Sequence, residues 1–150
     1  MESQYIEIDF FIKFFENCVL VAYPDPITKG EPYTVGWGST RKADGSKFKS
    51  GEEITQSTAD ALLTDYIMKN ITPYFKEIPY NLTSGQKAAL ASCWYNIKGG
   101  FQAFKKSKCY EAVCKKDYAT IFREWDWGVS QMKGLAKRRS CELYYFLRDL

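Results

Sequence analysis

The sequence predicts an α+β fold whose parts follow one another along the chain: an N-terminal helix, a small antiparallel β-sheet and a larger helical lobe, with a cleft between them. Two observations carry this prediction. Two short runs rich in β-branched and aromatic residues, 19–23 and 33–38, lie between turns that contain proline and glycine. After Ile54, apolar residues recur at three- and four-residue spacing, as in amphipathic helices.

The first third of the chain predicts a helix and up to three strands. Residues 5–16 carry apolar side chains at helical spacing, which indicates a helix that ends near Glu16. The runs 19–23 and 33–38 predict the paired strands. The polar segment 41–51 contains an Asp-Gly turn and predicts a third, weaker strand beside them.

The rest of the chain predicts helices. A long helix is expected after Ile54, capped by Thr55 or Ser57 and closing near Pro73. A buried helix is expected to start at Thr83, because Gln86 stands at capping-box spacing from it. Three shorter helices are expected over 107–114, 117–125 and 135–147, and the core of this lobe is expected to contain Trp94, Trp125 and Trp127.

Length and composition indicate one globular domain over residues 1–150. The 150 residues are 45% hydrophobic, enough to form a core, and no apolar run approaches the roughly 18 residues of a membrane-spanning helix. The absence of histidine excludes Ser-His-Asp and Cys-His catalysis and His-ligated metal sites. If the protein is an enzyme, carboxylates must transfer its protons.

The cysteines and the N-terminus indicate a chain made in a reducing compartment. Five cysteines, an odd number with no Cys-x-x-Cys pair, do not form a disulfide framework. The apolar cluster near the start is interrupted by Lys13 and preceded by acids, so a secretory signal is not expected. The predicted location is the cytoplasm.

Three residues near the predicted hairpin could perform glycosidic chemistry. Glu16 ends the first helix, Asp25 lies in the turn after the first strand, and Thr34 opens the second strand. Cleaving a glycosidic bond requires an acid that protonates the leaving oxygen and a carboxylate that activates a water or stabilises an oxocarbenium-like transition state. The apolar neighbours of Glu16 favour its protonated form, whereas Asp25 in a solvated turn is expected to be ionised.

Three ordered blocks resemble the phage-type lysozymes, the endolysins of glycoside hydrolase family 24. The first is Glu16, then Asp25, then Thr-Val-Gly-Trp-Gly from Thr34. The second is Leu-Thr-Ser-Gly-Gln-Lys-Ala-Ala-Leu over 82–90 with Tyr-Asn-Ile-Lys-Gly, and the third is Phe-Arg-Glu-Trp with Gly-Leu-Ala-Lys-Arg-Arg over 134–139. The resemblance extends from about residue 8 to the end of the chain.

The resemblance implies a lysozyme-like fold and hydrolysis of the β-1,4 bond between N-acetylmuramic acid and N-acetylglucosamine in peptidoglycan, with inversion and without a cofactor or metal. By position it implies that Glu16 is the general acid, and that Asp25 and Thr34 hold the attacking water. Substrate contacts are expected from Tyr33, Gly36 and Trp37. Gly36 and Trp37 belong to the Thr-Val-Gly-Trp-Gly block, and Tyr33 directly precedes it.

The resemblance also implies partners and a route to the substrate. A cell-wall enzyme without an export signal would accumulate in the host cytoplasm as a monomer until a separate holin-like pore protein releases it. It would lyse the host without stable membrane insertion and without binding nucleic acid.

Two departures from the family pattern leave alternatives open. Eight residues separate Asp25 from Thr34, more than is usual, so Glu31 is a rival second carboxylate. Ser39 stands where many members have histidine. A non-catalytic peptidoglycan-binding adaptor with the same fold is therefore the alternative function.

A third hypothesis is a small protein that binds nucleic acid. It draws on the basic residues 137–139 and the net charge of +3.

Overall fold

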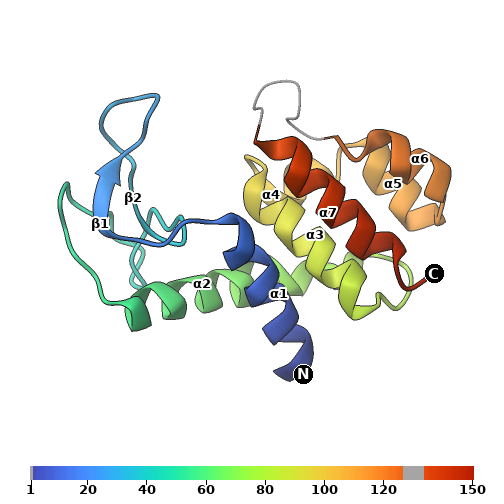
Figure 1. The fold of residues 1–150 in the computed structure, drawn as a ribbon, viewed down its shortest axis with the longest axis horizontal. Coiled ribbons are helices and arrows are strands. Elements are labelled where there is room, and N and C mark those ends of the chain that lie inside the picture. The colour runs from blue at the N-terminus through green and yellow to red at the C-terminus, as the bar shows by residue number, and fades with distance from the viewer. Residues whose placement is uncertain (1, 127–133) are drawn as a thin grey trace. The chain divides into compact units, whose positions relative to one another are not determined.

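A computed structural model of the chain describes residues 2–126 and 134–150. It contains two compact units, Lys13–Lys69 and the pair Met1–Ile12 with Asn70–Leu150. The elements, drawn in Figure 1, are in chain order α1 (Glu2–Phe15), β1 (Val19–Pro24), β2 (Tyr33–Gly36), α2 (Gln56–Asn70), the 3₁₀ helix η1 (Thr72–Glu77), α3 (Ser84–Asn96), α4 (Gly100–Phe104), α5 (Lys108–Lys115), α6 (Tyr118–Glu124) and α7 (Leu135–Leu147).

The predicted hairpin is confirmed in the unit Lys13–Lys69. Strands β1 and β2 form an antiparallel pair in which Tyr23 lies opposite Thr34 and Pro24 lies opposite Tyr33. The register is irregular between Val19 and Tyr23, so the first half of β1 is offset from β2. The β-branched and aromatic residues of both runs suit this pleated, half-buried surface.

The predicted third strand over 41–51 is wrong, since this segment contributes only an isolated bridge between Arg41 and Lys47. The Asp-Gly turn within it does form: the Asp44 carboxylate accepts the backbone N–H of Ser46 at 2.9 Å. The free edge of β1 is instead covered by the next few residues, where Ala22 N–H donates to the Glu52 carbonyl at 2.8 Å. The segment is too polar and too tightly turned to sustain a strand.

Helix α2 packs against the hairpin in this unit. Its start is capped by Thr55, whose hydroxyl accepts the N–H of Thr58 at 3.1 Å, as predicted. The helix ends at Asn70, before Pro73, because η1 takes over there. A small core forms between the hairpin and the helix, made of Ala22, Val35, Phe48 and Leu62, with Tyr33 and Ile54 packed against it.

The second unit is helical, and α3 and α7 lie side by side in it (Figure 1). The capping box of α3 is confirmed: the Thr83 side chain accepts from Gln86 N–H, and the Gln86 side chain accepts from Thr83 N–H. Helices α5, α6 and α7 match the three predicted ranges within a few residues. Trp94 and Trp125 are buried as predicted, whereas Trp127 lies outside the described residues.

Helix α4 was not predicted. It spans five residues, too few to show a hydrophobic period, and it begins after Gly99, which adopts φ of +88°. Its side chains Phe101 and Phe104 are buried, and Phe101 packs edge-on to Trp94 with ring centroids 4.9 Å apart. Within the described ranges, no helix is both long and apolar enough to cross a bilayer.

Candidate functional site

Glu16 lies immediately after α1, in the short non-helical segment 16–18 that leads into β1. Its side chain is half-buried. Three residues earlier, in the last turn of the helix, Lys13 forms an ion pair with Asp60 of α2 at 2.9 Å. The position of Glu16 at the end of the first helix is the one that the sequence predicted.

Asp25 follows β1 directly and is the first residue of the hairpin loop. Its Oδ1 accepts the backbone N–H groups of Thr28 at 2.9 Å and Ile27 at 2.8 Å. These hydrogen bonds, that of Thr28 first, lower the pKa of the Asp25 carboxyl below its ordinary value. These hydrogen bonds hold the Asp25 carboxylate in one orientation and favour its ionised form.

The strand pairing places Thr34 near the end of β1 at which Asp25 follows. Thr34 lies opposite Tyr23, and Asp25 stands two residues after Tyr23. Asp25 lies one residue beyond the end of β1, and its N–H donates to the Gly30 carbonyl at 3.1 Å, so the regular register of the two strands does not extend to it. Glu16 precedes β1 and Asp25 follows it, so the two acids flank the same strand.

Glu31, the rival carboxylate, has a partner of its own. Its Oε2 lies 2.5 Å from Nζ of Lys47, and that ammonium lowers the pKa of the Glu31 carboxyl. The two side chains are more than half exposed, at 57% and 54%. They line an open pocket of about 330 Å³ with Pro32, Tyr33, Thr40 and Arg41.

The three predicted substrate-binding residues differ in their surroundings. Tyr33 is partly buried against the small core and also lines the open pocket. Gly36 is buried, with φ of +62°, and its backbone sits close to Ala59 of α2. Trp37 donates its indole N–H to Asp60 at 2.8 Å, and the Lys13 ammonium lies 5.3 Å from the centre of its ring. Substrate contact by these residues stays a prediction.

Asp60 is the part of this unit that sequence reasoning missed. Besides Lys13 and Trp37, its Oδ1 accepts the Gln56 amide at 3.3 Å. Gln56 in turn accepts the thiol of Cys18 at 3.6 Å. Lys13 and then Trp37 lower the pKa of the Asp60 carboxyl. In the sequence this residue is an acid on a helix, four residues after Gln56, and such spacing is equally typical of a solvated helix face.

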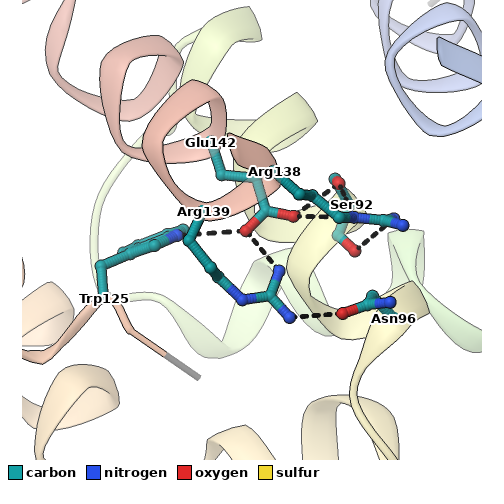
Figure 2. Close-up of polar contacts among 6 residues, drawn as sticks. All are labelled: Ser92, Asn96, Trp125, Arg138, Arg139 and Glu142. Atoms are coloured by element: carbon teal, nitrogen blue, oxygen red, sulfur yellow. Dashed lines mark hydrogen bonds and ion pairs between the residues drawn. The ribbon is translucent and has the colours of Figure 1, made fainter. Parts of the chain in front are cut away.

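A second polar network, shown in Figure 2, lies buried between α3 and α7. The Glu142 carboxylate accepts from Ser92 at 2.6 Å, from Arg139 at 2.6 Å and from Trp125 at 3.2 Å. Arg138 donates to the same carboxylate at 3.2 Å. The side chains of Arg138 and Arg139 are only 4% and 2% exposed, so they do not form the surface patch that the nucleic-acid hypothesis requires.

All five cysteines are free thiols. Cys93 and Cys109 are buried, and the other three are half-buried. Among the residues that the structure describes, no cluster of three or more acidic, cysteine or histidine side chains is arranged to hold a metal ion.

The arrangement of these elements defines a protein with the lysozyme fold. The endolysin of Escherichia coli O157:H7 phage FAHEc1 is 26% identical with a TM-score of 0.81, and the match covers 96% of this chain and 92% of that one. A mutant of P22 lysozyme is 28% identical with a TM-score of 0.75, covering 93% of this chain and 94% of that one.

Sequence comparison gives the family. Residues 13–142 match the family described as phage lysozyme, and this chain belongs to the phage lysozyme family. The endolysin of Bacillus phage PZA is 31% identical over 139 residues, and that of Lactococcus phage c2 is 28% identical over 141 residues; each match covers 90% of this chain. The chain spans 51% and 56% of the lengths of these two relatives, about half of each.

Proposed function

We propose that this chain is a muramidase that hydrolyses the β-1,4 bond between N-acetylmuramic acid and N-acetylglucosamine in bacterial peptidoglycan, and that residues 1–150 act as one lysozyme domain. The observation that supports the proposal is the placement of two acids around β1 in a chain of the phage lysozyme family: Glu16 precedes the strand, and Asp25, oriented by its hydrogen bonds, follows it.

In the proposed reaction, Glu16 donates its proton to the glycosidic oxygen as the bond from that oxygen to the anomeric carbon breaks. A water molecule attacks the same carbon from the opposite face, and Asp25 accepts its proton. Both backbone hydrogen bonds to Asp25 end on Oδ1, which favours Oδ2 as the oxygen that receives the proton. The Thr34 hydroxyl would hold the water. Exchange with solvent then returns both acids to their starting states.

Inversion is part of the proposal because the resemblance to the phage-type lysozymes implies it. Inverting glycosidases leave room for a water between carboxyl groups about 6.5–9.5 Å apart, whereas retaining enzymes bring them to about 5–5.5 Å. The proposed outcome is therefore one hydrolytic step, with no covalent sugar intermediate.

The test compares the wild type with Glu16→Gln on purified peptidoglycan and on outer-membrane-permeabilised bacteria. The amide has nearly the same shape but cannot donate the proton, so the rate should fall by about 10²–10⁴-fold. Glu53→Gln, an exposed glutamate of the same unit, is the control and should act like the wild type. Mass spectrometry of the products should find new reducing N-acetylmuramic acid ends without anhydro sugars.

Two results would overturn parts of this assignment. Undiminished cleavage by Glu16→Gln would remove Glu16 from the mechanism. A wild type that sediments with cell-wall sacculi but releases no reducing ends would favour the adaptor function instead.

The route to the substrate is part of the proposal. The protein would act as a monomer that stays in the host cytoplasm until a holin-like pore protein opens the membrane. Expression in bacteria should then leave the culture turbid until chloroform is added. Lysis without any membrane disruption would contradict the dependence on a pore.

A further inference from the structure

Two tethers join the segment that carries Glu16 to the first turns of α2. Before Glu16, the Lys13 ammonium pairs with Asp60 at 2.9 Å; after it, the Cys18 thiol donates to Gln56 at 3.6 Å. Gln56 and Asp60 stand one turn apart on α2 and are joined to each other at 3.3 Å. The non-helical segment 16–18 is thus held on both sides by one pair of side chains.

The same carboxylate also holds the end of β2. The Trp37 indole, three residues after Thr34, donates to Asp60 at 2.8 Å. The Lys13 ammonium lies over the Trp37 ring at 5.3 Å, so the three side chains contact one another. Asp60 therefore joins the end of α1, the end of β2 and the start of α2.

We propose that Asp60 is a positioning residue, which sets the place of Glu16 relative to Thr34 through Lys13, Gln56 and Trp37; the inference rests on the muramidase function proposed above. Asp60 does not exchange a proton with the substrate. Its role follows from the sensitivity of catalysis to geometry, since a misplacement of about 1 Å can lower a rate by 10²-fold.

The same helix supplies a matched control. Asp65 of α2 pairs with Lys69 at 2.7 Å, and its side chain is 44% exposed, against 42% for Asp60. Both residues of the control pair lie on α2, so that pair holds no other element. Asp65→Ala removes one ion pair within α2, whereas Asp60→Ala removes the ion pair with Lys13 and the hydrogen bonds from Trp37 and Gln56. Only Asp60→Ala releases the Glu16 segment.

The experiment measures kcat and KM separately on soluble glycan strands, at a temperature where all variants are more than nine-tenths folded. Asp60→Ala should lower kcat by about 10- to 100-fold with KM within about twofold. Asp65→Ala should leave both constants near the wild-type values. Asp60→Glu, which keeps the charge, should recover most of the lost kcat.

Coupling between the partners gives a second readout. Lys13→Met should lower kcat in the same way, and the double variant with Asp60→Ala should be little worse than Asp60→Ala alone, because both changes break the same tether. Additive losses, or a change in KM with kcat preserved, would overturn the positioning role.

Amide hydrogen exchange separates failure of this inference from failure of the proposed function. The segment 16–18 should exchange faster in Asp60→Ala than in Asp65→Ala, whether or not the protein cleaves peptidoglycan. Equal exchange in the two variants would overturn the tether. A wild type without hydrolytic activity would overturn the proposed function, and with it the catalytic purpose of the tether.

Discussion

Gly36 and Ala59 contact each other so closely that the space between them has no room for another carbon. A β-carbon on Gly36 would lie 3.0 Å from Cβ of Ala59 and 3.3 Å from its Cα. Gly36 also has φ of +62°, a conformation that residues with side chains rarely adopt. The close contact between these two small residues therefore packs the end of β2, the strand that carries Thr34, against α2.

Gly36→Ala should destabilise the protein through both strain and overpacking. The backbone conformation costs about 1 kcal/mol and the forced shift at Ala59 about 1–3 kcal/mol, so the unfolding free energy should fall by roughly 2–4 kcal/mol. Urea unfolding followed by tryptophan fluorescence measures this change.

Gly45→Ala separates the two contributions. Gly45 has φ of +84° but nothing within 4 Å of an added β-carbon. This variant should lose only about 1 kcal/mol. Equal losses of unfolding free energy at both positions would mean that the contact with Ala59 does not contribute to the effect of Gly36→Ala. Adding Ala59→Gly to Gly36→Ala should then restore no stability.

The choice between Asp25 and Glu31 as the second carboxylate is a prediction about activity. Asp25→Asn should lower the rate of peptidoglycan cleavage by about 10²-fold or more, since the amide cannot accept a proton from water. Glu31→Gln breaks only an exposed pair with Lys47 that solvent screens, so its rate should stay within a few-fold of the wild type. A larger loss from Glu31→Gln in the turbidity assay would transfer the role to Glu31.

Local patterns predicted most of the helices and the hairpin. The limits of α7 and the capping box at Thr83 follow from short-range spacing, which the chain displays directly. The third strand did not form because the turn at Asp44 closes on itself through Ser46. An Asp-Gly turn in a polar segment therefore does not by itself show whether a strand forms beside it.

Contacts across the sequence account for what could not be predicted. Asp60 meets Trp37 and Lys13, residues that are distant in the chain, and no local spacing marks the three as neighbours. In α7, Glu142 stands four residues after Arg138 and three after Arg139. This spacing is equally typical of ion pairs on an exposed helix face. Their burial depends on how α3 packs, and the sequence of α7 does not contain that information.

The buried carboxylate of Glu142 should be costly to neutralise. It is fully buried and paired with two guanidinium groups, so Glu142→Gln would remove the carboxylate that both buried cations share. We expect a loss of about 3–5 kcal/mol in the free energy of unfolding, measured by urea denaturation. Glu77→Gln breaks the exposed pair with Lys105 and should cost less than about 1 kcal/mol. Similar losses in the two variants would contradict a structural role for the buried network.

The ion pair of Asp60 should make stability depend on pH under acidic conditions. Lys13, and after it the Trp37 indole, lower the pKa of the Asp60 carboxyl from its ordinary value of 3.8. The folded protein therefore binds fewer protons at this site than the unfolded chain. The contribution of Asp60 to stability is complete above the unfolded pKa and is lost as the pH falls through the lower, folded pKa.

Asp60→Asn tests this dependence, because its amide does not titrate. The difference in unfolding free energy between the wild type and Asp60→Asn should be constant from about pH 7 to pH 5 and should shrink below about pH 4. Urea titrations at pH 7, 5, 4 and 3 measure it. In a Lys13→Met background the pH dependence of this difference should become shallower, since the largest cause of the lowered pKa is removed. A difference that is constant down to pH 3 would show that the folded protein does not stabilise the charged form of Asp60.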